Sequence, residues 1–301
     1  MQIFAATYTP LKKDNSFNPA VIDVYANHLK ENDLSGIFVN GSTGDFASLT
    51  IAERKEQLEA WANNKKGLKL INHVGDISLK NAIDLAKHSR DKADAIAAIA
   101  PFYFKPGNLG QLIEYCSKIA AAAPQLPFYF YHLPVLTNVN FDMQEFLKKA
   151  IAEIPNFQGI KFTENNLVAF QEVNGSAKGK DIFFGVDEAF LPAVAAGSKG
   201  AVGSTFNHLM PLYANILRAI EEGDFNEAQK LQRLSISFVK TLDQYGGFNG
   251  GGKSFMRALG VDCGPSRFPH TTLKNKQIDD VIASFTKLGL DKYLKISDTV
   301  K

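Results

Sequence analysis

The most informative residue in the chain is a lysine inside an apolar segment. Lys161 interrupts Phe157–Phe162, a run in which most other positions are apolar. Lysine is almost never buried without a partner or a purpose. Burial disfavours the charged ammonium, and the neutral amine that results can attack a ketone and form a Schiff base. The alternative is a lysine at a strand end whose ammonium reaches solvent, and the pattern alone leaves both interpretations open.

Hydroxyl groups occur in two further segments that could serve such a lysine. Tyr131 ends the apolar run Phe128–Tyr131. Its phenol could relay protons and orient a carboxylate, or it could simply pack in the core. Gly41–Gly44 holds Ser42 and Thr43 between glycines, so its hydroxyl and backbone N–H groups could bind a carboxylate or a phosphate. An ordinary turn is the alternative.

Two adjacent carboxylates, Asp187 and Glu188, follow Gly185. Carboxylates accept hydrogen bonds from hydroxyl groups, so the pair could hold a polyhydroxy substrate. Acidic residues are also favoured at the start of a helix by its dipole, and that alternative needs no ligand.

Two other patterns argue against nucleotide or metal chemistry. Gly247–Ser254 matches the P-loop pattern G-x-x-x-x-G-K-S, but a P-loop needs a buried strand immediately before it. The preceding stretch, Ser235–Tyr245, predicts a helix, so we interpret the glycines as a flexible connection between helices. The six histidines are scattered and lack the spacing of zinc sites, so we expect no metal.

These residues lie at the ends of short apolar runs that alternate with amphipathic segments such as Val21–Glu31 and Ile51–Asn63. Strands that alternate with helices of this length indicate βαβ units and a parallel sheet. The predicted strands are Ile3–Tyr8, Gly36–Val39, Leu68–Val74, Asp94–Ala100, Pro127–Tyr131, Phe157–Phe162, Asp181–Gly185 and Gly200–Ser204.

Eight such repeats predict an α/β fold, a closed (β/α)8 TIM barrel. An open doubly wound sheet is the alternative, but no glycine-rich dinucleotide loop follows the first strand. In the barrel, chemistry belongs at the C-terminal ends of the strands, where the polar residues above are found. After Ser204 the pattern is wholly helical. We therefore expect a barrel over residues 1–222 and, over residues 223–301, a C-terminal helical extension packed on it.

Composition limits the partners and the compartment. The 301 residues are 45% hydrophobic and carry a net charge of +2, with 33 basic and 31 acidic side chains. Such a balance gives no electrostatic reason to expect nucleic acid or a membrane surface. No apolar run is long enough to span a bilayer, and the two cysteines, Cys116 and Cys263, fit no disulfide or metal spacing. We expect a cytoplasmic protein.

Six motifs, taken together, resemble one enzyme family. They occur in order along the predicted barrel: GSTGD (Gly41–Asp45), PFYF (Pro101–Phe104), FYFYHLP (Phe128–Pro134), GIKFT (Gly159–Thr163), FGVDE (Phe184–Glu188) and GAVGSTFN (Gly200–Asn207). The chain resembles the N-acetylneuraminate lyase subgroup of the dihydrodipicolinate synthase/N-acetylneuraminate lyase family, whose members are class I aldolases.

The resemblance implies roles for individual residues. Lys161 matches the Schiff-base lysine, and Tyr131 matches the tyrosine that relays the proton and touches the pyruvate carboxylate. Ser42 and Thr43 match the carboxylate-binding pair. Tyr103 matches the tyrosine that reaches into a neighbouring subunit's site, and the resemblance implies a homotetramer. The residues that match the sugar-binding positions are Thr163, Gly185, Asp187, Glu188 and Ser204.

The branch of the family can be argued from one position. Dihydrodipicolinate synthases typically carry an arginine two residues after the proline of the Y-x-x-P segment, where this chain has Leu136. Leucine cannot pair with a substrate carboxylate, so the resemblance favours the lyase branch. Asp45 stands where glutamate is common, and Val186 stands where many bacterial lyases carry an aromatic residue.

The implied reaction is the cleavage of N-acetylneuraminate, a sialic acid, to pyruvate and N-acetylmannosamine, without a metal or organic cofactor. Two alternatives remain. Another pyruvate-dependent aldolase of the family would keep Lys161 and differ in its sugar-binding residues, whereas a non-catalytic sugar-binding barrel would keep the pocket and form no imine.

Overall fold

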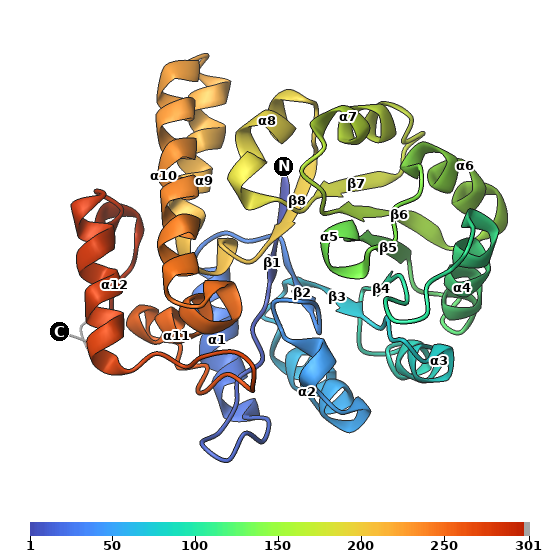
Figure 1. Ribbon diagram of the computed structural model, residues 1–301, viewed down its shortest axis with the longest axis horizontal. Coiled ribbons are helices and arrows are strands. Elements are labelled where there is room, and N and C mark those ends of the chain that lie inside the picture. The colour runs from blue at the N-terminus through green and yellow to red at the C-terminus, as the bar shows by residue number, and fades with distance from the viewer. Residues whose placement is uncertain (298–301) are drawn as a thin grey trace.

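The computed structural model describes residues 1–297 and contains a closed barrel of eight parallel strands in sequential order, with the last strand paired to the first (Figure 1). This confirms the predicted (β/α)8 TIM barrel. The strands are β1 Gln2–Ala6, β2 Gly36–Val39, β3 Lys69–His73, β4 Ala95–Ile99, β5 Phe128–His132, β6 Phe157–Phe162, β7 Asp181–Phe184 and β8 Gly200–Gly203.

Helices follow each strand and form the outer ring of the barrel, except for the short α5, which lies over the barrel opening (Figure 1). They are α1 Ile22–Lys30, α2 Ile51–Asn64, α3 Leu79–His88, α4 Leu109–Ala121, α5 Pro134–Thr137, α6 Met143–Glu153, α7 Leu167–Gly175, α8 Phe190–Ala195 and α9 Phe206–Glu221. Three short 3₁₀ turns lie among them, η1 Pro19–Val21, η2 Phe46–Ser48 and η3 Asp187–Ala189.

Local signals explain where individual helices begin. At the start of α2, the Thr50 hydroxyl accepts from the Glu53 N–H, and the Glu53 carboxylate accepts from the Thr50 N–H. This capping box supplies partners for two backbone donors that a helix start leaves unpaired. Pro19 occupies the first turn of η1, where its missing N–H costs nothing.

The side chains of each strand alternate between two apolar cores. In β1, Ile3 and Ala5 face the helices, whereas Phe4 and Ala6 face the barrel interior. Aromatic rings fill the interior: Phe183 stacks on Tyr129 with ring centroids 5.4 Å apart. The barrel interior is thus a packed core, and an open space can form only above it, at the C-terminal ends of the strands.

Up to residue 297, the last that the structure describes, the part of the chain after α9 contains only helical elements joined by loops, as the pattern predicts. Its elements are α10 Phe225–Gln244, η4 Phe248–Gly252, α11 Lys253–Phe255, η5 Met256–Leu259, α12 Asn275–Lys287 and η6 Asp291–Tyr293. Helix α10 lies alongside α9, and α12 lies at the outer edge of the molecule (Figure 1). The division of the chain near residue 222 stays a prediction. Within residues 1–297, no helix has the length and apolar character needed to cross a membrane.

The P-loop-like segment has a different structure from the flexible connection that we expected. A helix, α10, precedes it, and Phe248–Gly252 forms a π-helical turn that runs directly into α11. The glycines are needed for close packing, since a methyl group at Gly252 would lie 2.5 Å from the Tyr8 hydroxyl.

Candidate active site

Lys161 lies near the C-terminal end of β6, and its side chain is only 4% exposed. The amine does not reach the surrounding solvent, as the alternative interpretation would require. Its Nζ atom lies 3.9 Å from the centre of the Tyr131 ring and 4.2 Å from the centre of the Phe38 ring. Among the described residues, no carboxylate lies within ion-pairing distance of this amine. The aromatic faces therefore provide its nearest electrostatic partners.

A cavity of about 320 Å³ opens above Lys161, large enough for a small-molecule ligand. The structure brings together around it nine of the ten residues proposed from the sequence. They are Ser42, Thr43, Tyr131, Lys161, Thr163, Gly185, Asp187, Glu188 and Ser204. The C-terminal extension adds a wall that sequence reasoning missed, made of Val239, Leu242, Asp243 and Phe248.

Tyr103, the tenth residue, does not line this cavity. It lies in the loop after β4, 73% exposed, beside Phe104, which is 86% exposed. The two rings contact each other edge to face, with centroids 5.0 Å apart. Within one chain the structure therefore does not bring Tyr103 to Lys161.

One end of the cavity is the loop after β2, which carries Ser42 and Thr43. The Ser42 hydroxyl lies 3.4 Å from the Tyr131 hydroxyl, so the loop and β5 meet through a polar contact. The Thr9 hydroxyl donates to the Gly44 carbonyl at 2.6 Å, which ties the loop to the segment after β1. Asp45, at the end of the loop, adopts a left-handed conformation and accepts a hydrogen bond from Ser48.

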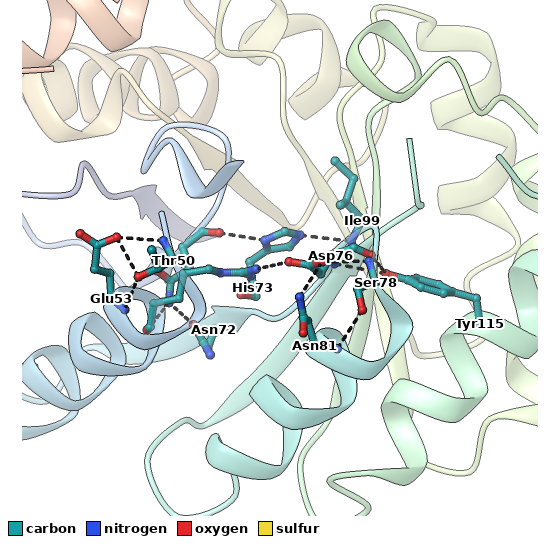
Figure 2. A network of polar contacts seen from close by, with 11 residues as sticks. Thr50, Glu53, Asn72, His73, Asp76, Ser78, Asn81, Ile99 and Tyr115 are labelled. Atoms are coloured by element: carbon teal, nitrogen blue, oxygen red, sulfur yellow. Dashed lines mark hydrogen bonds and ion pairs between the residues drawn. The ribbon is translucent and has the colours of Figure 1, made fainter. Parts of the chain in front are cut away.

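A buried histidine lies beneath Tyr131. The His73 Nδ1 atom lies 2.8 Å from the Asn40 carbonyl, and the Ile99 N–H donates to Nε2 (Figure 2). These contacts assign the proton to Nδ1, because Nε2 must accept. Burial, reinforced by the charge of Arg54, holds the pKa of His73 well below its ordinary value. A neutral imidazole therefore packs edge-on against the Tyr131 ring, with centroids 5.9 Å apart.

Arg54 holds this histidine segment from α2. Its guanidinium donates to the His73 carbonyl at 2.8 Å and to the Asp76 carboxylate at 3.3 Å, within the network of Figure 2. Burial lowers the pKa of Arg54 to about 10. Sequence reasoning missed this arginine, although a signal was present: Arg54 shares one helix face with Leu58 and Trp61, which are buried core residues.

The opposite end of the cavity carries polar groups suited to hydroxyls. The Thr163 hydroxyl is buried and has no hydrogen-bond partner within residues 1–297. A methyl group at Gly185 would overlap this hydroxyl, so glycine is required at that position. An unpaired buried hydroxyl is costly, and a ligand in the cavity would supply its partner.

Asp187 is anchored more firmly than the sequence indicated. Its Oδ2 atom accepts from the backbone N–H of Thr205 at 2.8 Å and from its hydroxyl at 2.7 Å. The Tyr213 hydroxyl lies 2.6 Å from the same Thr205 hydroxyl. Burial raises the pKa of Asp187, while Thr205 and the charge of Lys161 oppose the rise. One carboxylate oxygen is thus committed to the fold.

Glu188 lies next to Asp187 and is exposed at the mouth of the cavity. Partial desolvation raises its pKa, and the charges of Asp187 and Asp243 add to the effect. Among the described residues, no side chain forms an ion pair or a side-chain hydrogen bond with the Glu188 carboxylate. It is available to a ligand.

Comparison with known proteins identifies close relatives. The model of the Dihydrodipicolinate synthetase family matches residues 1–288. The chain is 37% identical over 294 residues to N-acetylneuraminate lyase A of Xenopus laevis, covering 96% of both chains. It superposes on the solved Proteus mirabilis N-acetylneuraminate lyase with a TM-score of 0.91 and 36% identity, covering 96% of this chain and 98% of that one. A catalytic lysine mutant of the Ruminococcus gnavus sialic acid aldolase gives a TM-score of 0.88 and 25% identity over 97% of both chains.

Proposed function

This chain belongs to the dihydrodipicolinate synthetase family, and we propose that it is a class I aldolase that cleaves N-acetylneuraminate to pyruvate and N-acetylmannosamine. The observation that carries the proposal is the arrangement of the cavity. A buried amine lies between a hydroxyl-rich loop suited to a carboxylate and a set of acceptors suited to a sugar. A keto acid with a long polyol chain needs all three features.

The proposed reaction begins with the open-chain substrate. Its carboxylate binds Ser42, Thr43 and backbone N–H groups of their loop. The Lys161 amine adds to the C2 ketone, water leaves, and a protonated imine forms. This imine accepts the electron pair of the C3–C4 bond as that bond breaks.

Proton transfer completes the cleavage. As the C3–C4 bond breaks, the C4 hydroxyl loses its proton and becomes the aldehyde of N-acetylmannosamine. The enamine left on Lys161 gains a proton at C3, and water then hydrolyses the imine to release pyruvate. We assign the relay to Tyr131, whose hydroxyl lies 3.4 Å from that of Ser42.

The choice of a sugar substrate is supported by the end of the cavity opposite the Ser42 loop. Thr163, Asp187, Glu188 and Ser204 offer groups for hydroxyls, and Gly185 leaves room for the Thr163 side chain. Leu136 lies at the rim of the cavity and is 62% exposed. A dihydrodipicolinate synthase would need an arginine at this position to bind the carboxylate of its second substrate. This supports a lyase over a dihydrodipicolinate synthase, in agreement with the lyase relatives.

Assembly and location are further parts of the proposal. The aromatic pair Tyr103 and Phe104 projects into solvent, and exposed aromatic side chains of this size are typical of interfaces. We propose a homotetramer in which Tyr103 reaches the cavity of a neighbouring subunit. We also propose that the enzyme works in the cytoplasm.

A coupled assay of pyruvate release from N-acetylneuraminate tests the activity directly. Turnover of that substrate, and not of aspartate semialdehyde with pyruvate, is the expected result. A panel of sugar keto acids distinguishes another aldolase of the family. A protein that binds sialic acid but releases no pyruvate from any keto acid would be a sugar-binding barrel, and the proposal would be wrong.

A further inference from the structure

We propose that the C-terminal helical extension positions the two ends of the cavity separately, through two side-chain amides. Gln232 holds the sugar-binding end, and Asn249 holds the carboxylate-binding end. Both are positioning residues that act through other groups. The inference rests on the proposed function and adds to it two residues outside the set identified above.

Gln232 lies on α10, only 5% exposed, against the turn that carries the acidic pair. Its Nε2 atom donates to the carbonyls of Asp187 and Glu188, at 3.3 Å and 3.1 Å. Its Oε1 atom accepts from the Leu191 N–H at 2.7 Å. The two carbonyls belong to η3, and the Leu191 N–H belongs to the first turn of α8, where donors lack partners within the helix. One amide therefore fixes the turn from which both carboxylates project.

Asn249 lies in η4, within the P-loop-like segment. Its Nδ2 atom donates to the carbonyl of Ser42 at 3.2 Å. Its own carbonyl accepts from the Ser266 hydroxyl at 2.6 Å, which fixes the turn in place. Lys253, four residues further along the chain, donates from Nζ to the Pro265 carbonyl at 2.6 Å and holds the same segment. Through Asn249, the P-loop-like segment therefore contacts the loop that would bind the substrate carboxylate.

The glycines of the P-loop-like segment explain how Asn249 comes so close to Ser42. A methyl group would lie 2.9 Å from the Thr271 carbonyl at Gly250 and 3.0 Å from the Leu242 carbonyl at Gly251. The first distance is shorter than a Cβ atom tolerates and the second would force the neighbouring backbone to move, so glycine at both positions lets the turn pack this tightly. The backbone approach brings Asn249 to Ser42.

The two amides contact different ends of the cavity. Outside α10, the Gln232 amide contacts the segment after β7, and within α10 it donates to the Ser235 hydroxyl at 2.7 Å. The Asn249 amide contacts the loop after β2 and also lies 3.4 Å from the His270 ring nitrogen Nε2. Displacement of a substrate-positioning group by about 1 Å is enough to cost roughly a hundredfold in rate. Loss of each amide should therefore impair a different part of the reaction.

The test compares Gln232→Met and Asn249→Ala in two assays. One measures kcat and KM for cleavage of N-acetylneuraminate. The other measures the pyruvate concentration that half-saturates inactivation by borohydride, a reaction that needs Lys161 and the carboxylate end of the cavity but not the sugar-binding end. For Gln232→Met we expect cleavage kcat/KM to fall about tenfold or more, with half-saturating pyruvate within about twofold of wild type. For Asn249→Ala we expect half-saturating pyruvate to rise about tenfold, with KM for the sugar rising alongside.

Matched controls lie on the exposed face of α10. Gln229→Met and Asn226→Ala make the same changes at exposed positions and should leave both assays at wild-type values. Gln232→Glu and Asn249→Ser serve as second variants if the first ones fold poorly. Gln232→Glu replaces the amide donor with an acceptor, and Asn249→Ser shortens the side chain by one atom, which moves its donor away from the Ser42 carbonyl. Equal losses in both assays for both amides, in proportion to a lowered Tm, would overturn the inference. So would wild-type values in both.

The wild-type protein separates this inference from the proposed function. If it traps pyruvate without cleaving N-acetylneuraminate, the proposed substrate is wrong. The borohydride arm of the Asn249 experiment is unaffected, because it uses pyruvate alone. The Gln232 experiment is then run on the keto acid of the panel that the wild type does cleave.

Discussion

Lys161 and Tyr131 occupy paired positions on neighbouring strands, so the sheet itself sets the relation between amine and phenol. Neither side chain depends on a flexible loop for its position. Residues held on strands are placed more reliably than residues on loops. We therefore expect substitutions of Lys161 and Tyr131 to change the catalytic rate more than the stability of the fold.

Borohydride reduction in the presence of pyruvate should modify Lys161 alone. Lys253 provides an internal control, because burial lowers its pKa to about 8 and leaves it partly uncharged near neutral pH. It lines a cavity of about 10 Å³, too small for pyruvate. Peptide mapping by mass spectrometry locates the adduct. An adduct on Lys253, or none on Lys161, would refute the Schiff-base assignment, and Lys161→Ala should abolish turnover.

Tyr131→Phe should lower kcat by roughly 10²–10⁴-fold, the usual contribution of general acid–base catalysis, with little change in KM. The ring remains against His73 and Phe38, so its packing is kept. Steady-state kinetics on N-acetylneuraminate make the measurement. If KM rises and kcat does not fall, the phenol binds substrate and another group moves the proton.

The acidic pair should divide into one structural and one binding carboxylate. Glu188→Gln removes charge-assisted hydrogen bonds worth roughly 1.5–3 kcal/mol, so kcat/KM should fall by one to two decades with Tm unchanged. Asp187→Asn should lower both kcat/KM and Tm, because Oδ2 accepts from Thr205. Kinetics and melting curves on both variants test the division, and a fall in Tm for Glu188→Gln would contradict it.

At the scale of elements, glycines determine how closely β8 and the turn after β7 approach. A methyl group at Gly203, the last residue of β8, would overlap the Asp187 carboxylate. Sequence reasoning placed Gly203 in a strand but gave no reason for glycine there. The reason lies in a side chain from another strand, which the local pattern does not contain.

Gly203→Ala should therefore lower both lyase activity and Tm, because Asp187 must move away from Thr205. Overpacking of this kind typically costs about 1–3 kcal/mol. The matched control is Gly175→Ala at the end of α7, where an added methyl group meets nothing within 4 Å. That change should leave activity intact and Tm equal or slightly higher. Wild-type activity and Tm in Gly203→Ala would show that Asp187 has room to shift.

The elements themselves were largely predictable, and their ends were not. Hydrophobic periodicity located all eight strands, since buried parallel strands are nearly continuous apolar runs. We predicted that β5 ends at Tyr131, one residue too early, because histidine can carry a charge and therefore does not indicate a core position. In the fold His132 is buried and contacts Glu164 at 3.1 Å. The glycines of η4 indicated flexibility locally, whereas packing against the barrel makes them helical.

At the scale of the molecule, the cavity is shared between the barrel and the extension. Apart from Asp243, the polar residues that line the cavity come from barrel strands and their loops, so motif spacing could identify them. Motif spacing could not identify the apolar wall from the extension, which consists of Val239, Leu242 and Phe248. The sequence of an apolar helix face does not indicate which surface that face covers. Such long-range pairings are decided by tertiary packing.

One ion pair ties the extension to the N-terminal part of the barrel. The Arg267 guanidinium donates to both oxygens of Glu53, to the Ser48 carbonyl at 2.6 Å and to the Asn15 carbonyl at 2.7 Å. Arg267, together with Thr50, lowers the pKa of Glu53 to about 2. Because the pKa is depressed in the folded state, the pair stabilises the protein above about pH 4.5. That stabilisation is lost as the pH falls towards 2.

Arg267→Met should therefore lower Tm at pH 7 by a few degrees, since about 1 kcal/mol corresponds to roughly 2–4 °C in domains of comparable size. The difference in Tm between wild type and variant should shrink as the pH is lowered from 5 to 3, because wild type loses the pair and the variant has none to lose. A remainder should persist from the two carbonyl contacts, which do not titrate. Lys230→Met removes an exposed pair with Glu227 and should change Tm little at any pH, as surface pairs contribute little. Thermal melts at constant ionic strength make the comparison. A Tm difference that is the same at pH 7 and pH 3 would mean that the carbonyl contacts, and not the carboxylate, hold the extension on the barrel.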